Sequence, residues 1–352
     1  MSAPSPRPKL TYIETLRGAA CFGLVMYHVV GPHPQAGMEL PSGHYLFLSM
    51  LLFVDFRMPL FSFISGYIFR AHVGSIAQFS NAVARKFRRL MVPMISVGTV
   101  YWLVHLSMGR SVPPYVELFY LPYTYLWFLP ATFLIMTLFY GFNLISGNRA
   151  LLIAGAVIVL AGGFWVARVI WTPNLFASLN ALYIAPYFMC GYLWANQARM
   201  QALVDRAYLV KRVRRGLCVL LVGLLLVKLA SILNVFEPSF HQQRLLRLFI
   251  GLSGCSLLLL VRPEISFLAR IGQHSYAIFL FHVFFTGGFL EVVHRFWPTA
   301  PDLPVFAAGV AVGLTGPILT SALILRLPIA PLLFLGIRMK KKTPPVSQGR
   351  VS

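Results

Sequence analysis

Two side chains that could take part in one reaction lie near the start of the chain, in "YIETLRGAACFGLVMYHVV", residues 12–30. Arg17 is a permanent cation that can bind an anionic group, and His28 can accept and return a proton near neutral pH. Eleven helical residues span about 16 Å and return to nearly the same face. The spacing therefore predicts one cavity in which Arg17 holds an anionic ligand at the membrane surface and His28 acts as a base deeper inside. Glu14 is near enough in sequence to pair with Arg17.

The second apolar segment also carries polar side chains near its middle and a pair of small residues near its end. Residues two apart do not face each other on a helix, so Asp55 and Arg57 are expected to find partners on other segments. Ser65 and Gly66 could let either a ligand or a neighbouring helix come close, and the sequence does not separate these alternatives.

A cluster of arginines, Arg85, Arg88 and Arg89, precedes the third apolar segment in "NAVARKFRRLMVP", which we expect to be a cytosolic loop. Such a cluster can bind lipid headgroups, or it can bind a phosphorylated cofactor through bidentate hydrogen bonds. No glycine-rich phosphate loop accompanies it, so the sequence does not support nucleoside triphosphate chemistry or hydride transfer.

A late apolar stretch, "IGQHSYAIFLFHVFF", brings Tyr276 and His282 into another segment. A single histidine in such a place is more often structural than catalytic, so His282 is a candidate only for a supporting role. The four cysteines are scattered singly, in neither the spacing of a zinc site nor a disulfide framework, and we expect no metal.

The composition is that of a membrane protein. Of the 352 residues, 58% are hydrophobic and only 11% are charged, and the mean hydropathy is +0.74. We predict an all-α integral membrane protein with about ten transmembrane helices, at residues 16–33, 46–69, 90–108, 124–145, 150–167, 180–196, 216–234, 244–261, 273–293 and 303–325.

The distribution of basic residues predicts the orientation of these helices. Most of the 30 Lys and Arg residues lie in segments on the same side as the N-terminus, which places both termini in the cytosol. The chain then divides into a leader (1–15), a transmembrane domain (16–325) and a basic tail (326–352) that can rest on anionic lipid. The net charge of +21 therefore reflects membrane orientation, and no soluble basic domain is present to bind nucleic acid.

Five motifs resemble the acyltransferase 3 family of multi-spanning membrane acyltransferases. They are "YIETLRGAACFGLVMYH", with arginine and histidine eleven residues apart, and "RMPLFSFISGYIF", "RKFRRLMVP", "YLWFLPA" and "IGQHSYAIFLFHVFF". Their order and spacing agree with the family from residue 12 to about residue 325. The resemblance implies transfer of an acyl group, commonly acetyl, from cytosolic acyl-CoA to a carbohydrate hydroxyl across the membrane, in a bacterial inner membrane.

The resemblance also implies roles for individual residues. His28 would be the catalytic base that takes the proton of the hydroxyl, because a sugar hydroxyl is otherwise a weak nucleophile. The residues expected to bind acyl-CoA are Arg17, Arg85, Arg88, Arg89, Ser65, Gly66 and Tyr276. The residues with a possible supporting role are Glu14, Arg57, Asp55 and His282.

Two other functions stay open at this point. A transporter or flippase for a polysaccharide or lipid-linked precursor would use Asp55, Arg57 and Lys228 as contacts within the membrane, but no inverted repeat is evident in the sequence. A lipid-embedded subunit of a polysaccharide export assembly would need neither CoA nor His28. The sequence does not indicate the acceptor glycan, the length of the acyl chain or the oligomeric state.

Overall fold

The computed structural model describes residues 11–147, 149–198, 200 and 206–338. Most of the predicted leader (1–15) and about half of the predicted basic tail (326–352) lie outside the described residues. The described chain is all helical, with no strand assigned in it. The α-helices are α1 (Thr11–Val30), α2 (Tyr45–Tyr67), α3 (Ile76–Ser107), α4 (Phe128–Ile145), α5 (Ala150–Val166), α6 (Ser178–Asn196), α8 (Ala207–Ile232), α9 (Phe240–Val261), α10 (Ser266–Gln273), α11 (Ser275–Phe296), α12 (Asp302–Ile324) and α13 (Ala330–Leu335).

Three short 3₁₀ helices, η1 (Tyr115–Phe119), η2 (Thr124–Trp127) and η3 (Leu175–Ala177), complete the described elements. Each of the ten predicted segments overlaps one of the longer helices. By length and composition, seven helical stretches among the described residues can cross a membrane: Tyr45–Tyr67, Ile76–Ser107, Tyr115–Ile145, Ala207–Ile232, Phe240–Val261, Ser275–Phe296 and Asp302–Ile324. The chain is therefore a multi-pass membrane protein, while the count of ten and the cytosolic termini stay predictions.

The arginine cluster lies on a helix, so the prediction of a loop there was wrong. Helix α3 begins at Ile76, and the side chain of its N-cap residue Ser75 accepts a hydrogen bond from the backbone N–H of Gln78 at 3.3 Å. The residues that follow are rich in alanine, arginine and lysine, which favour helices, and contain no glycine or proline before Pro93. Helix α3 therefore presents the cluster from a rigid backbone.

Helices α1 and α10 pack with their backbones in contact. A Cβ atom added to Gly18 would lie 1.9 Å from the backbone oxygen of Leu268, and one added to Gly272 would lie 1.9 Å from that of Glu14. The hydroxyl of Thr15 also accepts a hydrogen bond from the N–H of Ile265 at 3.2 Å. This close approach fixes Arg17 beside the start of α11.

Helices α2 and α6 approach each other in the same way. A Cβ atom on Gly66 would lie 1.8 Å from the backbone oxygen of Phe188, and one on Gly191 would lie 2.0 Å from that of Phe63. Of the two alternatives for Gly66, the structure therefore shows helix packing. Ser65, one residue earlier, points to a different side of α2.

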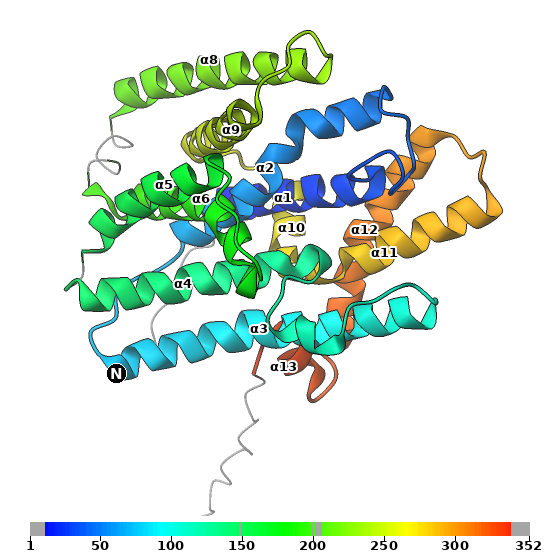
Figure 1. The fold of residues 1–352 in the computed structure, drawn as a ribbon, viewed down its shortest axis with the longest axis horizontal. Helices are drawn as coiled ribbons and strands as arrows, with labels where there is room; N and C mark the ends of the chain where they lie inside the picture. The colour runs from blue at the N-terminus through cyan, green and yellow to red at the C-terminus, as the bar shows by residue number, and fades with distance from the viewer. Residues whose placement is uncertain (1–10, 148, 199, 201–205, 339–352) are drawn as a thin grey trace, which may run out of the picture.

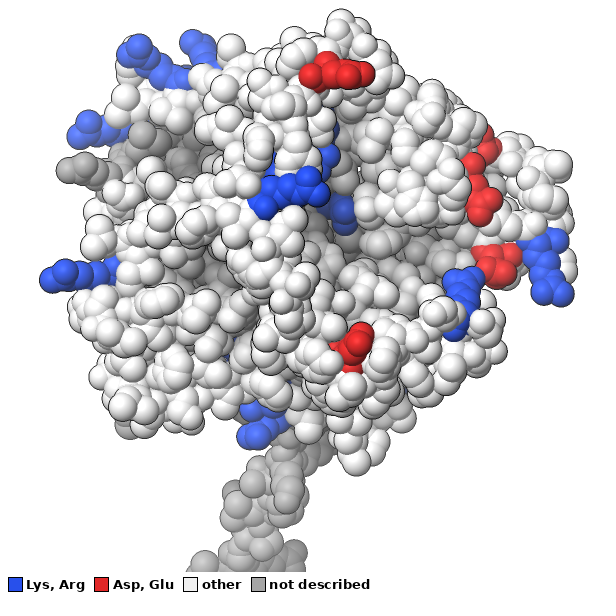
Figure 2. All heavy atoms as spheres, viewed as in Figure 1, with Lys and Arg blue, Asp and Glu red and all other residues white. Residues whose placement is uncertain are grey.

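Most of the long helices lie side by side, and α8 lies at one edge of the bundle against α9 and α2 (Figure 1). Lys228 is the buried residue of α8, whose other described side chains are exposed or half-exposed. Figure 2 shows that uncharged residues make up most of this face, with basic side chains near its left and right margins, at its lower edge and beside a central hollow. Such a wide uncharged surface is what contact with lipid requires.

Candidate active site

A cavity of about 500 Å³ lies among α1, α2, α3, α4 and α11, and we call it the arginine cavity. Five residues predicted to bind acyl-CoA line it: Arg17, Ser65, Arg85, Arg89 and Tyr276. The structure also adds two cations that the sequence analysis did not select, Arg70 and Lys86. Both could have been selected from the sequence, because Arg70 directly follows the motif "RMPLFSFISGYIF" and Lys86 lies inside the arginine cluster.

The arginine cavity is strongly positive. Five cationic side chains line it, and none of its described lining residues is Asp or Glu. Arg70, Arg85 and Arg89 are exposed, whereas Phe128, Phe279 and others at the far end are buried, so the cavity runs from a basic rim to an apolar floor. Several guanidinium groups around one space are suited to bind an anion with more than one phosphate.

Contacts within and between helices hold two of these cations, Arg17 and Arg89, in place. Arg17 donates a hydrogen bond to Glu14 at 2.9 Å, which confirms the predicted pair. The Tyr276 hydroxyl donates to the backbone oxygen of Arg89, and the Arg89 guanidinium lies 5.3 Å from the centre of the Tyr276 ring. These contacts join α11 to α3 at the rim of the cavity.

A second cavity of about 340 Å³ shares Arg70, Arg85 and Tyr140 with the arginine cavity. Its other polar lining residues are His72, Gln78 and Asn81. The two cavities together therefore form an extended polar region around two shared arginines.

Two residues predicted to bind acyl-CoA are not among the residues that line either cavity. Gly66 packs against α6, as described above. The backbone of Arg88 is covered by the end of α13, where a Cβ on Gly336 would lie 2.6 Å from the Arg88 oxygen. Helical periodicity explains the difference, because Arg85 and Arg89 share one face of α3 and Arg88 turns away from it.

Three phenylalanines, Phe61, Phe128 and Phe279, line the inner end of the arginine cavity, and we call them the aromatic layer. Their ring centroids are 6.2 Å apart for Phe61 and Phe128, 6.3 Å for Phe61 and Phe279, and 5.6 Å for Phe128 and Phe279. They come from three different helices, so together they close the floor of the cavity.

His28 lies beyond the aromatic layer and does not line the arginine cavity. Its ring is 4.7 Å from that of His282 and 6.3 Å from that of Tyr125. His282 comes one helical turn after Phe279, and Tyr125 one turn before Phe128. The prediction that Arg17 and His28 share one cavity was therefore wrong, because rings from other helices fill the space between them.

The tautomer of His282 follows from its hydrogen bonds. Its Nδ1 lies 2.8 Å from the backbone oxygen of Ile278 and 3.0 Å from that of Phe279, so this nitrogen must carry the proton. Its Nε2 is then a bare acceptor, and it is buried with no hydrogen-bond partner among the described residues. His282 can therefore accept a hydrogen bond from an N–H of His28 and orient that ring.

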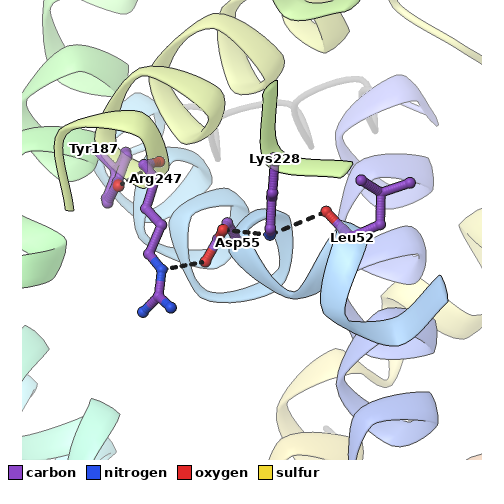
Figure 3. Close-up of polar contacts among 5 residues, drawn as sticks. All are labelled: Leu52, Asp55, Tyr187, Lys228 and Arg247. Atoms are coloured by element: carbon purple, nitrogen blue, oxygen red, sulfur yellow. Dashed lines mark hydrogen bonds and ion pairs between the residues drawn. The ribbon is translucent and has the colours of Figure 1, made fainter. Parts of the chain in front are cut away.

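Asp55 faces away from the histidines, toward α8 and α9. Lys228 donates to Asp55 at 2.5 Å and to the backbone oxygen of Leu52 at 3.1 Å, and Arg247 lies 3.9 Å from the same carboxylate (Figure 3). The prediction that Asp55 finds partners on other helices is confirmed. The carboxylate of Asp55 lies between Lys228 and Arg247, and Asp55 does not line the arginine cavity.

The Asp55–Lys228 pair provides a test of how α8 is held. Removing the charge of Asp55 leaves Lys228 buried without a counter-ion, which costs about 3–5 kcal/mol, and the two side chains are only 7% and 10% exposed. Asp55→Leu alone should therefore lower the free energy of unfolding by about this amount. The double variant Asp55→Leu, Lys228→Met should lose much less, as measured by denaturant unfolding in detergent. Equal losses in the single and double variants would contradict a coupled pair.

The comparisons with known proteins identify the family of this chain. A family model described as an acyltransferase domain matches residues 10–322, which includes every residue of the arginine cavity and both histidines. No curated protein and no solved structure matches the chain. Since the match covers most of the 352 residues, this multi-pass membrane protein belongs to the acyltransferase 3 family.

Proposed function

We propose that this protein is a membrane O-acyltransferase that moves an acyl group, acetyl in the simplest case, from acyl-CoA to a carbohydrate hydroxyl. The strongest support for acyl-CoA as the donor comes from the arginine cavity. The arginine cavity carries five cations and no carboxylate among its described lining residues, and its floor lies one helical turn from His282, whose ring faces His28. The donor would be bound as a substrate, and the proposed chemistry needs no metal.

The polar and apolar parts of acyl-CoA would lie at opposite ends of the cavity. The phosphates of acyl-CoA would lie among Arg70, Arg85 and Arg89 at the exposed rim, partly in the second cavity. The apolar arm would extend past Ser65 toward the aromatic layer. A volume of about 500 Å³ is within the range of small-molecule binding sites.

The transfer itself needs the aromatic layer to move. The thioester would pass between Phe61, Phe128 and Phe279 to reach His28, so their displacement is a step of the reaction. His28 would take the proton of the acceptor hydroxyl as its oxygen attacks the thioester carbonyl carbon. When the carbon–sulfur bond breaks, the thiolate would recover this proton, leaving an ester on the acceptor, free CoA and a neutral His28.

The acceptor would approach His28 from the opposite end of the bundle. In this orientation the rim of the arginine cavity faces the cytosol, where acyl-CoA is found, in agreement with the distribution of basic residues. The glycan would then be acylated on the far side of the membrane, which for a bacterial inner membrane is the side of surface and exported polysaccharides.

A transporter has less support. That function would use Asp55, Arg57 and Lys228 as substrate contacts, yet Asp55 and Lys228 bind each other. A substrate would have to replace this buried ion pair, which is costly in a membrane.

Binding of CoA tests the donor site directly. Each charge-assisted hydrogen bond contributes about 1.5–3 kcal/mol, so the double variant Arg85→Ala, Arg89→Ala should bind CoA at least about 100-fold more weakly. The measurement is titration of CoA into the full-length protein in lipid nanodiscs. Arg149→Ala is the matched control, since it removes an exposed arginine that lines neither cavity. Undetectable binding to the wild type, or an equal loss in the control, would contradict the proposal.

A further inference from the structure

Arg57 is a buried cation. Neither the arginine cavity nor the contact between His28 and His282 explains its role. It lies on α2, one helical turn beyond Phe61 of the aromatic layer, and therefore at the depth of His28. Its Nε is buried and has no hydrogen-bond partner, and no carboxylate of the described residues lies within ion-pair distance of it. A cation inside a membrane protein without a counter-ion is costly and points to a function.

The direction of the Arg57 side chain is set by α1. A Cβ on Gly23 would lie 3.8 Å from the Cβ of Arg57, so α2 passes close to α1 at this point. The guanidinium carbon then lies 3.5 Å from the centre of the Tyr27 ring, one turn further along α1. His28 is the next residue, with its ring 5.1 Å from that of Tyr27 and perpendicular to it. Arg57 thus extends toward the side of α1 that carries His28.

The ion pair between Asp55 and Lys228 leaves Arg57 without a carboxylate partner. Asp55 is only two residues away and would be the nearest carboxylate in sequence, but it lies on another side of α2, where Lys228 and Arg247 surround it (Figure 3). Lys228 therefore satisfies Asp55 without drawing Arg57 out of the histidine region. The guanidinium can then interact with an anion that appears only during the reaction.

Two other polar groups near the histidines already use their donors. The Tyr125 hydroxyl already donates to the backbone oxygen of Leu280 at 2.8 Å. The Nδ1–H of His282 is bound to two backbone oxygens, and its Nε2 is an acceptor. Arg57, in contrast, has a buried Nε–H without a hydrogen-bond partner among the described residues.

We propose that Arg57 stabilises the negative charge on the thioester carbonyl oxygen during acyl transfer, an inference that rests on the proposed function. As the acceptor oxygen attacks and His28 takes its proton, the carbonyl π electrons move onto this oxygen. The guanidinium binds the resulting oxyanion until the carbon–sulfur bond breaks and the carbonyl re-forms. Donors placed where charge develops accelerate acyl transfer, and loss of one typically costs about 10²–10³ in rate.

The test compares two ligands on the full-length protein in nanodiscs. CoA measures donor binding alone, and a trifluoromethyl ketone analogue of acetyl-CoA, whose hydrate has a tetrahedral carbon with an ionisable oxygen, measures oxyanion binding. Arg57→Gln should bind CoA within about twofold of the wild type but bind the analogue about 100-fold more weakly. Arg57→Lys should recover part of the loss, because it restores the charge.

Arg247→Gln is the matched control, since it removes a cation on the other side of α2 and should leave the ratio of the two affinities unchanged. A melting temperature near that of the wild type would show that the variants are folded. If Arg57→Gln binds CoA normally and the affinity ratio equals that of the wild type, the role of Arg57 is refuted while the donor site stands. If the wild type does not bind CoA, the proposed function itself fails.

Discussion

His28→Ala is expected to remove acyl transfer almost completely while the protein still inserts into the membrane. General base catalysis contributes about 10²–10⁴-fold to the rate of such reactions, and His28 is the histidine whose ring is free of the backbone contacts that hold His282. Surface glycans from cells that express the variant should lack the acyl mass seen with the wild type, as they do in cells without the gene. Mass spectrometry of these glycans measures the loss and names both acyl group and acceptor.

His294→Ala provides the comparison for this experiment, because His294 is an exposed histidine near the end of α11. Cells with this variant should retain the acyl mass. If His28→Ala retained wild-type acylation at equal protein level, His28 could not be the base, and the proposed mechanism would be wrong even with CoA bound.

Gly18→Ala is expected to destabilise the protein strongly and to weaken CoA binding at the same time. The added methyl group would lie 1.9 Å from the Leu268 oxygen, a backbone atom that cannot move without separating α1 from α10. Overpacking of this kind costs about 1–3 kcal/mol, and occasionally more. Arg17 immediately precedes Gly18 on α1, so the same displacement would move it within the arginine cavity. Denaturant unfolding and CoA titration measure the two effects.

Gly155→Ala is the control for the glycine substitution. Gly155 lies inside α5 with no atom within 4 Å of an added Cβ, so alanine meets open space there. Alanine also favours a helix over glycine by about 1 kcal/mol, and this variant should be as stable as the wild type or more so. Similar losses in both variants would mean that the α1–α10 contact has no special role.

The sequence was sufficient to predict the class of the protein and the residues around the donor. Mean hydropathy and the lengths of apolar runs predict membrane helices because lipid offers the backbone no hydrogen bonds. The motifs selected Arg17, Arg85, Arg89, Ser65 and Tyr276, which the structure brings to one cavity. The Glu14–Arg17 pair was predictable because it is a contact within one helix.

Contacts between helices were not predictable in this way. Spacing along α1 indicates that Arg17 and His28 share a face, but it cannot indicate that Phe61, Phe128 and Phe279 meet between them. Nor could it separate Gly66, which packs against α6, from the neighbouring Ser65, which lines the cavity.

What the sequence by itself determined is the set of helices, the family and the chemical types available at the site. Tertiary structure alone decided that His282 faces His28, that Lys228 binds Asp55, and that Arg57 is left with a free donor among the described residues. The physical reason is that periodicity and hydropathy act within one helix, whereas the partners of a buried charge come from helices distant in sequence. Their pairing depends on close backbone contacts, such as those at Gly18 and Gly191, which set how the helices meet.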